Sequence, residues 1–232
     1  MSDIADNLQA VLARIARAAT AAGRDPRHVR LLAVSKTWPL DCVLSAAEAG
    51  QTAFGENYVQ EGQEKASATP TLEWHFIGPL QSNKTRAVAE HFAWVHSVDR
   101  EKIAERLSAQ RPADLAPLEI CVQVNISGEA SKSGCAPAAA AALCAYVATL
   151  PRLRLRGLMT IPEASADPAQ QRAAFAALRE LQQQILSSGL LPAPQDFDTL
   201  SMGMSHDLEA AIAEGATLVR VGTAIFGERN YA

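Results

Sequence analysis

The sequence predicts an α/β fold, a single (β/α)8 TIM-type barrel with an extra N-terminal helix, in one domain over residues 1–232. Two observations lead to this prediction. Short apolar runs alternate strictly with longer amphipathic or alanine-rich runs, which is the pattern of a parallel sheet covered by helices. This unit recurs eight times in 232 residues, which suits a compact barrel better than the alternative, an open doubly wound sheet.

The first expected element is an amphipathic helix over residues 3–22, because Leu8, Val11 and Ile15 fall on one helical stripe. No helix is expected after the last strand, since only residues 225–232 remain there. The N-terminal helix is therefore expected to fill that place in the outer ring of helices.

Eight apolar runs of strand length follow in order along the chain. The expected strands span residues 31–35, 52–55, 74–77, 94–97, 118–125, 154–159, 197–201 and 218–222. The expected helices between them span residues 40–49, 57–67, 81–91, 100–109, 136–150, 168–188 and 204–214. Gly50, Gly189 and Gly215 stand where helix C-caps belong, which supports the ends of three of these helices.

The composition is that of a packed globular protein. Hydrophobic residues make up 48% of the chain and charged residues 20%, which disfavours long disorder. The net charge is −4 without a basic block, so nucleic acid is not an expected partner. No apolar stretch approaches the roughly 20 residues of a membrane helix, and the polar first residues lack the features of a signal peptide. The four cysteines show no metal-ligand spacing, so we expect a reduced, cytoplasmic protein without a metal site. No segment has the pattern of an oligomer interface, so we expect a monomer.

Lys36 closes the apolar run 31–35 and is the most informative residue of the chain. Side chains alternate along a strand, so Lys36 shares a face with Leu32 and Val34, at the carboxyl end where α/β proteins bind ligands. Desolvation at such a place lowers the pKa of an amine and lets it attack a carbonyl carbon. The alternative is a lysine that only extends to solvent from a strand end.

The loops after the seventh and eighth expected strands occupy the place where (β/α)8 barrels recurrently bind phosphate. Ser201 offers a hydroxyl, and Gly203 lets the backbone approach an anion closely. Gly222 and Thr223 add two backbone amides and a second hydroxyl. Each loop alone is equally consistent with turn glycines and helix caps, but two such loops on adjacent strands favour an anion site.

Arg220 lies within the eighth expected strand, where alternation points it into the barrel interior together with Leu218 and Gly222. A buried arginine is costly unless it is paired or bound to a ligand, and a salt bridge to an inward carboxylate such as Glu56 is the alternative. A lysine, a phosphate cradle and an inward arginine together suit pyridoxal 5′-phosphate. Lys36 would then form the Schiff base, and Arg220 would donate to the pyridine nitrogen.

Other polar residues are weaker candidates. His75 and Met159 lie at the ends of expected strands, and each is as consistent with a core residue as with a ligand contact. His96 has no partner at a recognisable spacing and is expected to be exposed or structural. No nucleophile elbow precedes His206, so hydrolase chemistry is not expected. Residues 131–134 are expected to form an exposed loop, with a mobile cover over the barrel mouth as the alternative.

Six segments, in order along nearly the whole chain, resemble the YggS/PROSC family of pyridoxal phosphate homeostasis proteins. They are Leu-Leu-Ala-Val-Ser-Lys (31–36), Phe-Gly-Glu-Asn-Tyr-Val-Gln-Glu (54–61), Trp-His-Phe-Ile-Gly-Pro-Leu-Gln-Ser-Asn-Lys (74–84), Arg-Gly-Leu-Met-Thr-Ile (156–161), Leu-Ser-Met-Gly-Met-Ser (200–205) and Val-Arg-Val-Gly-Thr-Ala-Ile-Phe-Gly-Glu-Arg (219–229). The resemblance implies a barrel like the N-terminal domain of alanine racemase, with pyridoxal phosphate held on Lys36.

The resemblance also implies the remaining site residues. By position in the motifs, Arg220 would bind the pyridine nitrogen. The phosphate would be held by Ser201, Gly203, Gly222 and Thr223, and the ring would be lined by Asn57, His75 and Met159. His206 stands where many relatives have an acidic residue, which affects a helix start rather than the phosphate cradle.

The resemblance bears on activity as well. Racemases with this barrel add a β-rich domain that carries a catalytic tyrosine, whereas this sequence ends at Ala232, just after the barrel. Only Tyr58 follows a strand end closely enough to act as a second acid–base group. The expected function is therefore buffering or delivery of pyridoxal phosphate in vitamin B6 homeostasis, with apo enzymes as candidate receivers and no catalytic residues. A small pyridoxal-phosphate-dependent amino-acid racemase is the alternative.

Overall fold

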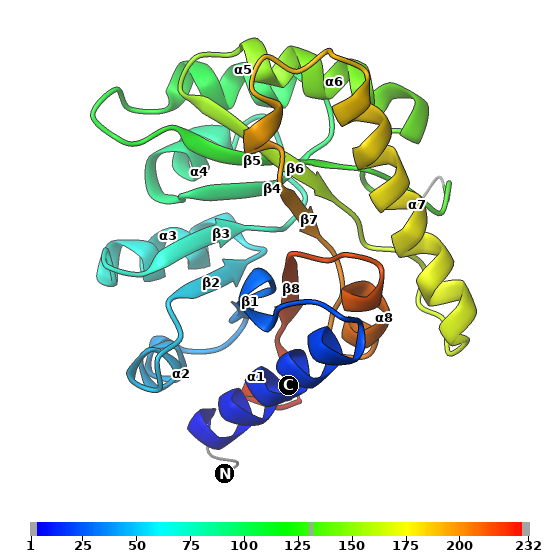
Figure 1. Cartoon of the computed structure of the whole chain (residues 1–232). Coiled ribbons are helices and arrows are strands. Elements are labelled where there is room, and N and C mark those ends of the chain that lie inside the picture. The colour runs from blue at the N-terminus through cyan, green and yellow to red at the C-terminus, as the bar shows by residue number, and fades with distance from the viewer. Residues whose placement is uncertain (1–3, 130–131, 229–232) are drawn as a thin grey trace.

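Eight parallel strands close into a barrel in the computed structural model, which describes residues 4–129 and 132–228 (Figure 1). Each strand pairs with the next one along the chain, and β8 pairs with β1 to complete the ring. The predicted (β/α)8 barrel is confirmed, and the open doubly wound alternative is excluded.

Helices alternate with the strands as expected. The strands are β1 (Arg30–Val34), β2 (Ala53–Glu56), β3 (Glu73–Phe76), β4 (Trp94–Val98), β5 (Leu118–Gln123), β6 (Leu153–Met159), β7 (Thr199–Ser201) and β8 (Leu218–Val221). The helices are α1 (Ile4–Ala21), α2 (Leu40–Glu48), α3 (Val59–Ala68), α4 (Thr85–His91), α5 (Glu101–Gln110), α6 (Pro137–Thr149), α7 (Pro168–Ser187), α8 (Leu208–Ala213) and α9 (Thr223–Phe226), with short 3-10 helices at Pro26–His28 and Pro194–Asp196. The expected helices over 81–91 and 204–214 begin later than expected, because turns precede α4 and α8.

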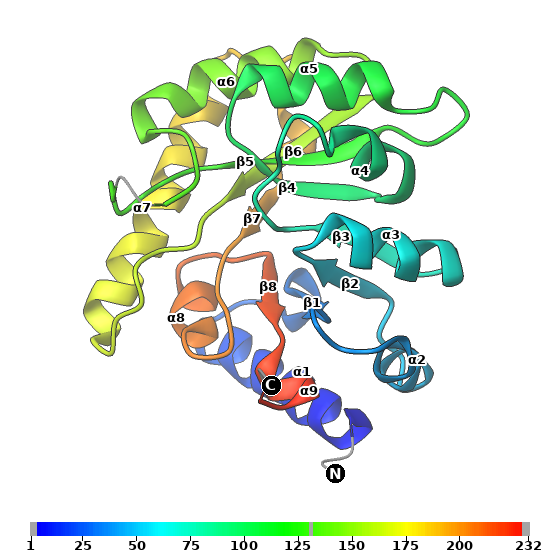
Figure 2. The same cartoon turned by 180° about the vertical axis from the view of Figure 1, so that it is seen from behind.

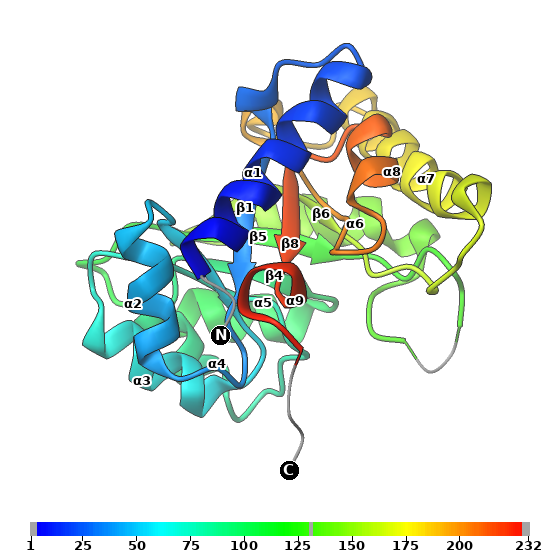
Figure 3. The same cartoon turned by 90° about the horizontal axis from the view of Figure 1, so that it is seen from below.

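Helix α1 completes the outer ring, as expected. It packs against α2 on one side and α8 on the other, and it also contacts α9 (Figures 2 and 3). Its apolar stripe is buried, with Leu8 fully enclosed. The expectation that no helix follows the last strand is wrong, because α9 forms one turn directly after Gly222. Four residues are too few to show a helical period in the sequence.

Strand alternation separates two buried layers. One layer lies between the strands and the helices and includes Leu31, Ala33, Val219 and Val221. The barrel interior contains two smaller apolar clusters, one of Leu32, Val34, Ala53, Ile77 and Leu218, the other of Trp94, Cys121 and Met159. Lys36 and Arg220 continue the interior rows of β1 and β8, which is the orientation that alternation predicted.

The pairing of β5 with β6 is interrupted by one extra residue. Ile120 lies opposite Leu155, whereas Cys121 lies opposite Gly157, so the register shifts there. Gly157 follows the shift and pairs with Thr199 of β7, where an added Cβ would lie 1.8 Å from the Thr199 carbonyl oxygen. Strands β6 and β7 can pair this tightly because residue 157 lacks a side chain.

None of the helices in the described part of the chain is both long enough and apolar enough to cross a membrane.

Candidate functional site

A cavity of about 240 Å³ lies at the carboxyl ends of the strands. It is lined by residues at the ends of six strands: Val34, Lys36, Asn57, Ile77, Ile161, Met204, Ser205, His206, Arg220, Gly222 and Thr223. Five of the nine residues predicted for the cofactor therefore share one space, namely Lys36, Asn57, Arg220, Gly222 and Thr223. They meet although they are far apart in sequence, because all parallel strands end at the same rim of the barrel.

Helix α3 holds the backbone on both sides of Lys36. Lys65 Nζ donates to the Ser35 carbonyl oxygen at 2.9 Å, and the Thr37 N–H donates to Glu61 Oε1 at 2.7 Å. Thr37 has a φ of 69°, a left-handed conformation that is unfavourable for a β-branched residue. These contacts hold the turn that follows Lys36 and so determine where its side chain enters the cavity.

Glu56 faces the helices rather than the barrel interior. Its Oε1 accepts from Lys65 Nζ at 2.7 Å and from Ser35 Oγ at 2.7 Å. Burial raises the pKa of this carboxyl, while the charge of Lys65 acts against that shift. The alternative of a salt bridge between Arg220 and Glu56 is therefore wrong, because alternation puts Glu56 on the same side of β2 as Phe54.

Arg220 lies at the floor of the cavity, with 4% of its surface exposed. Its Nη1 donates to Ser201 Oγ at 2.7 Å and its Nη2 to the Thr160 carbonyl oxygen at 2.9 Å. Burial lowers its pKa to about 10, so the guanidinium is still charged at neutral pH. Within residues 4–129 and 132–228 no carboxylate forms an ion pair with this group. A buried cation of this kind needs compensation from a ligand or from more distant groups.

Two predicted ring or phosphate contacts, Ser201 and His75, lie beneath the cavity instead of on its wall. Both are fully buried. The Ser201 hydroxyl is engaged by Arg220 and by His96 Nδ1, at 2.8 Å from the latter. The His75 ring stacks on Trp94, with centroids 5.2 Å apart, and its Nδ1 lies 2.9 Å from His96 Nε2. Direct contact of these two residues with a ligand stays a prediction, and their present partners favour a supporting role.

Met159 and Gly203 are also absent from the cavity wall. Met159 is fully buried beside Trp94 and Cys121 in the barrel interior. Gly203 has a φ of 92°, and an added Cβ would lie 2.5 Å from the Ala211 Cβ of α8, so only glycine fits there. Its carbonyl oxygen accepts from the Arg220 N–H at 2.9 Å, so the loop after β7 holds the backbone of Arg220.

Several features of the wall are suited to a phosphorylated aldehyde. Asn57 Oδ1 is buried without a hydrogen-bond partner among the described residues. Gly222 and Thr223 begin α9, and the first amides of a helix have no partner within the helix. Together with the amine of Lys36 and the guanidinium of Arg220, these groups match the aldehyde, ring nitrogen and phosphate of pyridoxal 5′-phosphate in chemical type.

Sequence reasoning missed two histidines. His96 was expected to be exposed or structural; it is buried, and it lies between His75 and Ser201 inside the barrel. Strand alternation could have predicted their contact, because His75 and His96 both occupy inward positions of neighbouring strands. His206 lines the cavity, although it was expected to affect only a helix start. Its place in the loop after β7 was the signal for it.

A (β/α)8 barrel with Lys36 and Arg220 in one cavity is the arrangement expected of a barrel protein that binds pyridoxal phosphate. A family model described as alanine racemase, N-terminal domain, matches residues 7–230, and the chain belongs to this family. The alanine racemase of Corynebacterium glutamicum illustrates the shared fold, with a TM-score of 0.71 and 18% identity over 96% of this chain and 62% of that one.

Relatives that match this chain over nearly their whole length identify a narrower family. The Pseudomonas aeruginosa protein named pyridoxal phosphate homeostasis protein is 63% identical over 100% of this chain and 98% of its own. The structure of PipY from Synechococcus elongatus PCC7942 with pyridoxal phosphate bound is 39% identical, with a TM-score of 0.75 over 92% of this chain and 100% of that one. The pyridoxal phosphate homeostasis family indicated by the six motifs is thereby confirmed.

Proposed function

We propose that this protein binds pyridoxal 5′-phosphate in the cavity at the carboxyl ends of the barrel and serves vitamin B6 homeostasis by buffering or delivering the cofactor. The observation that carries the proposal is the meeting of the Lys36 amine, the Arg220 guanidinium and the turn at Gly222–Thr223 in one cavity of about 240 Å³. The name of the Pseudomonas aeruginosa relative and the cofactor bound to PipY support it.

Each wall residue has a proposed task. Lys36 is the covalent attachment residue, and the cofactor supplies the aldehyde carbon that its amine attacks. Arg220 donates to the ring nitrogen and, because it stays protonated, keeps that nitrogen unprotonated. The amides and hydroxyl at Gly222 and Thr223 hold the phosphate. Asn57 accepts a hydrogen bond beside the ring, since its buried Oδ1 has no partner among the described residues.

The remaining assignments are part of the same proposal. Ser201 and Gly203 support the phosphate side of the site, and His75 and Met159 support the ring side from below. Residues 1–232 act as one cofactor-binding domain, as a cytoplasmic monomer that passes pyridoxal phosphate to apo enzymes.

A role without catalytic turnover is favoured over racemisation. Two-base racemisation needs an acid–base group on each side of the substrate carbon. Tyr58, the candidate for the second group, is 58% exposed and is not among the residues that line the cavity in the described part of the chain. The relatives at high identity carry the name of homeostasis proteins, which agrees with a binding role.

Borohydride trapping tests the attachment residue. Purified protein is mixed with pyridoxal phosphate, reduced and digested, and the expected result is one added cofactor mass on the peptide that contains Lys36. Lys36→Ala is expected to lose the mass, whereas Lys102→Ala, which removes an exposed lysine from α5, is expected to retain it. Label spread evenly over several lysines would contradict a dedicated site.

A transfer experiment tests the role. Loaded protein is mixed with an apo pyridoxal-phosphate enzyme, and activation is compared with that by the same concentration of free cofactor in the presence of a cofactor scavenger. Activation that survives the scavenger supports delivery. Steady loss of Cα deuterium from an amino acid, catalysed by the protein itself, would instead show that it is a racemase-type enzyme.

A further inference from the structure

A continuous chain of polar side chains runs through the barrel interior from the cofactor cavity to the opposite end. Arg220 Nη1 contacts Ser201 Oγ at 2.7 Å, and Ser201 Oγ contacts His96 Nδ1 at 2.8 Å. His96 Nε2 contacts His75 Nδ1 at 2.9 Å, and His75 Nε2 contacts Glu73 Oε1 at 2.6 Å. The five residues come from β8, β7, β4 and β3, so the chain crosses the barrel from wall to wall as well as from end to end.

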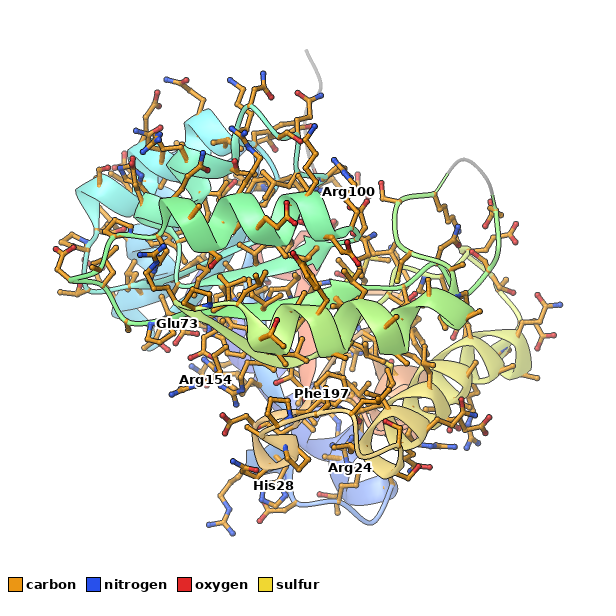
Figure 4. All side chains as sticks on the ribbon, turned by 90° about the horizontal axis from the view of Figure 1, so that it is seen from above. Arg24, His28, Glu73, Arg100, Arg154 and Phe197 are labelled. Carbon is orange, nitrogen blue, oxygen red and sulfur yellow. The ribbon has the colours of Figure 1, made fainter. Side chains whose placement is uncertain are left out.

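The far end of this chain lies at the amino ends of the strands. Glu73 is the first residue of β3, its side chain is 36% exposed, and it also accepts from Arg30 Nη2 at 2.8 Å. Figure 4 shows Glu73 close to Arg154 and well apart from Arg100, which follows β4. The chain therefore joins two opposite faces of the barrel.

The two ends of the chain determine the direction of every hydrogen bond in it. Arg220 can only donate, and the carboxylate of Glu73 can only accept. With neutral rings, His75 must then carry its proton on Nε2 and accept at Nδ1 from His96 Nε2–H, which leaves His96 Nδ1 to accept from the Ser201 hydroxyl. Burial lowers the pKa of both histidines, and the bond to His75 lowers the pKa of Glu73 to about 2, so neutral rings and an ionised Glu73 agree with this pattern.

Such a one-way chain stabilises both of its ends. Each of its dipoles presents an acceptor atom toward Arg220 and a donor proton toward Glu73, and aligned hydrogen bonds in a low-dielectric interior strengthen one another. Arg220 has no carboxylate ion pair within residues 4–129 and 132–228, so these dipoles, together with the Thr160 carbonyl oxygen, compensate its buried charge.

We propose that Ser201, His96, His75 and Glu73 are positioning residues for Arg220: they orient its guanidinium at the cavity floor and link its charge to a carboxylate at the far end of the barrel. The link to cofactor binding rests on the proposed function, in which Arg220 meets the ring nitrogen. The hydrogen-bonded chain of side chains is present in the ligand-free protein, so it can be tested separately from cofactor binding.

The first test uses the ligand-free protein labelled with ¹⁵N in its histidine rings. NMR is expected to show His75 and His96 as neutral rings protonated on Nε2. Glu73→Gln removes the far charge at nearly constant volume and is expected to shift the ring signals of His96, which Glu73 does not touch, as well as those of His75. A wild-type His96 ring that is charged or protonated on Nδ1 would overturn the proposal, and so would a Glu73→Gln effect confined to His75.

The second test measures the affinity for pyridoxal 5′-phosphate and the absorbance spectrum of the bound cofactor. Ser201→Ala and Glu73→Gln are each expected to weaken binding about tenfold, as expected for a disturbed hydrogen bond of a charged group, and to shift the absorbance maximum. Ser97→Ala is the matched control, because Ser97 is buried next to His96 but its hydroxyl has no partner among the described residues. It is expected to change neither quantity.

The outcomes separate the two proposals. If the wild type binds normally and both Ser201→Ala and Glu73→Gln leave the affinity and the spectrum unchanged, the positioning role is overturned. Absence of binding by the wild type would contradict the proposed function, and the histidine signals of the ligand-free protein would still decide whether the chain exists. A variant that fails to fold does not affect the wild-type histidine measurement, which can refute the chain by itself.

Discussion

Acidification from pH 7 to pH 5 is expected to cost the ligand-free protein up to about 4 kcal/mol of stability through His75 and His96 alone. Both rings are fully buried. Burial lowers the pKa of His75 below 6.5 and that of His96 well below it, because the charged form is poorly solvated in the interior. In the unfolded chain the rings take up protons as the pH falls through 6.5, whereas the folded rings take them up only at a lower pH. The unfolded state then binds more protons, so the free energy of unfolding falls as the pH is lowered.

The magnitude follows from proton linkage. A ring that is neutral in the folded state and titrates normally in the unfolded state contributes about 2 kcal/mol between pH 7 and pH 5. Two such rings give about 4 kcal/mol as the upper limit. The contribution of His75 to the loss of stability is smaller than about 2 kcal/mol to the extent that its hydrogen bond to Glu73 raises its pKa against the effect of burial.

Urea unfolding followed by far-UV circular dichroism at pH 7, 6 and 5 measures this loss. His96→Gln is expected to remove about 2 kcal/mol of the pH dependence, because one of the two rings no longer titrates. Cys121→Ala, a buried change in the same barrel interior, is expected to lower stability equally at each pH. If His96→Gln keeps the full pH dependence of the wild type, the ring has the same pKa in the folded and unfolded states, and the reasoning is refuted.

Three further substitutions test the framework around the site. Glu56→Gln leaves Lys65 buried with less countercharge and is expected to cost about 3 kcal/mol in urea unfolding; a loss below about 1 kcal/mol would contradict the buried ion pair. Gly157→Ala forces a methyl group against the Thr199 carbonyl oxygen and is expected to lower the free energy of unfolding by about 3 kcal/mol. Hydrogen exchange of the β6 and β7 amides is expected to become faster, and unchanged exchange would argue against the close approach. Leu8→Ala on α1 is expected to cost about 3 kcal/mol and to lower the thermal midpoint by about 10 °C, whereas a negligible shift would show that α1 does not cover the barrel.

The order of elements was predictable because it depends on local patterns. Apolar runs of strand length and amphipathic runs of helix length are visible in the sequence wherever an element is long enough, as at α1 and α7. Helix α9 escaped prediction because one turn, Thr223–Phe226, shows no period. The late starts of α4 and α8 escaped it because polar turns before a helix resemble the first turn of the helix itself.

Part of the cavity wall was predictable for a related reason. Lys36, Asn57 and the turn at Gly222–Thr223 lie at or just after strand ends, and all strand ends of a parallel barrel share one rim. The sequence contains no such signal for how deep in the barrel an inward side chain lies. Whether an inward side chain reaches the rim or stays below it depends on strand tilt and register, as Ser201 and His75 illustrate.

Alternation and short motifs are properties of neighbouring residues, so they were enough to predict the barrel, the inward direction of Lys36 and Arg220, and the family. The hydrogen-bond partners of the buried side chains could be found only from the folded chain. Glu56 pairs with Lys65 behind the strands, and His96 lies between His75 and Ser201, since each contact joins different strands or a strand and a helix. Such contacts depend on how the barrel closes, which is a property of the whole chain and not of any one segment.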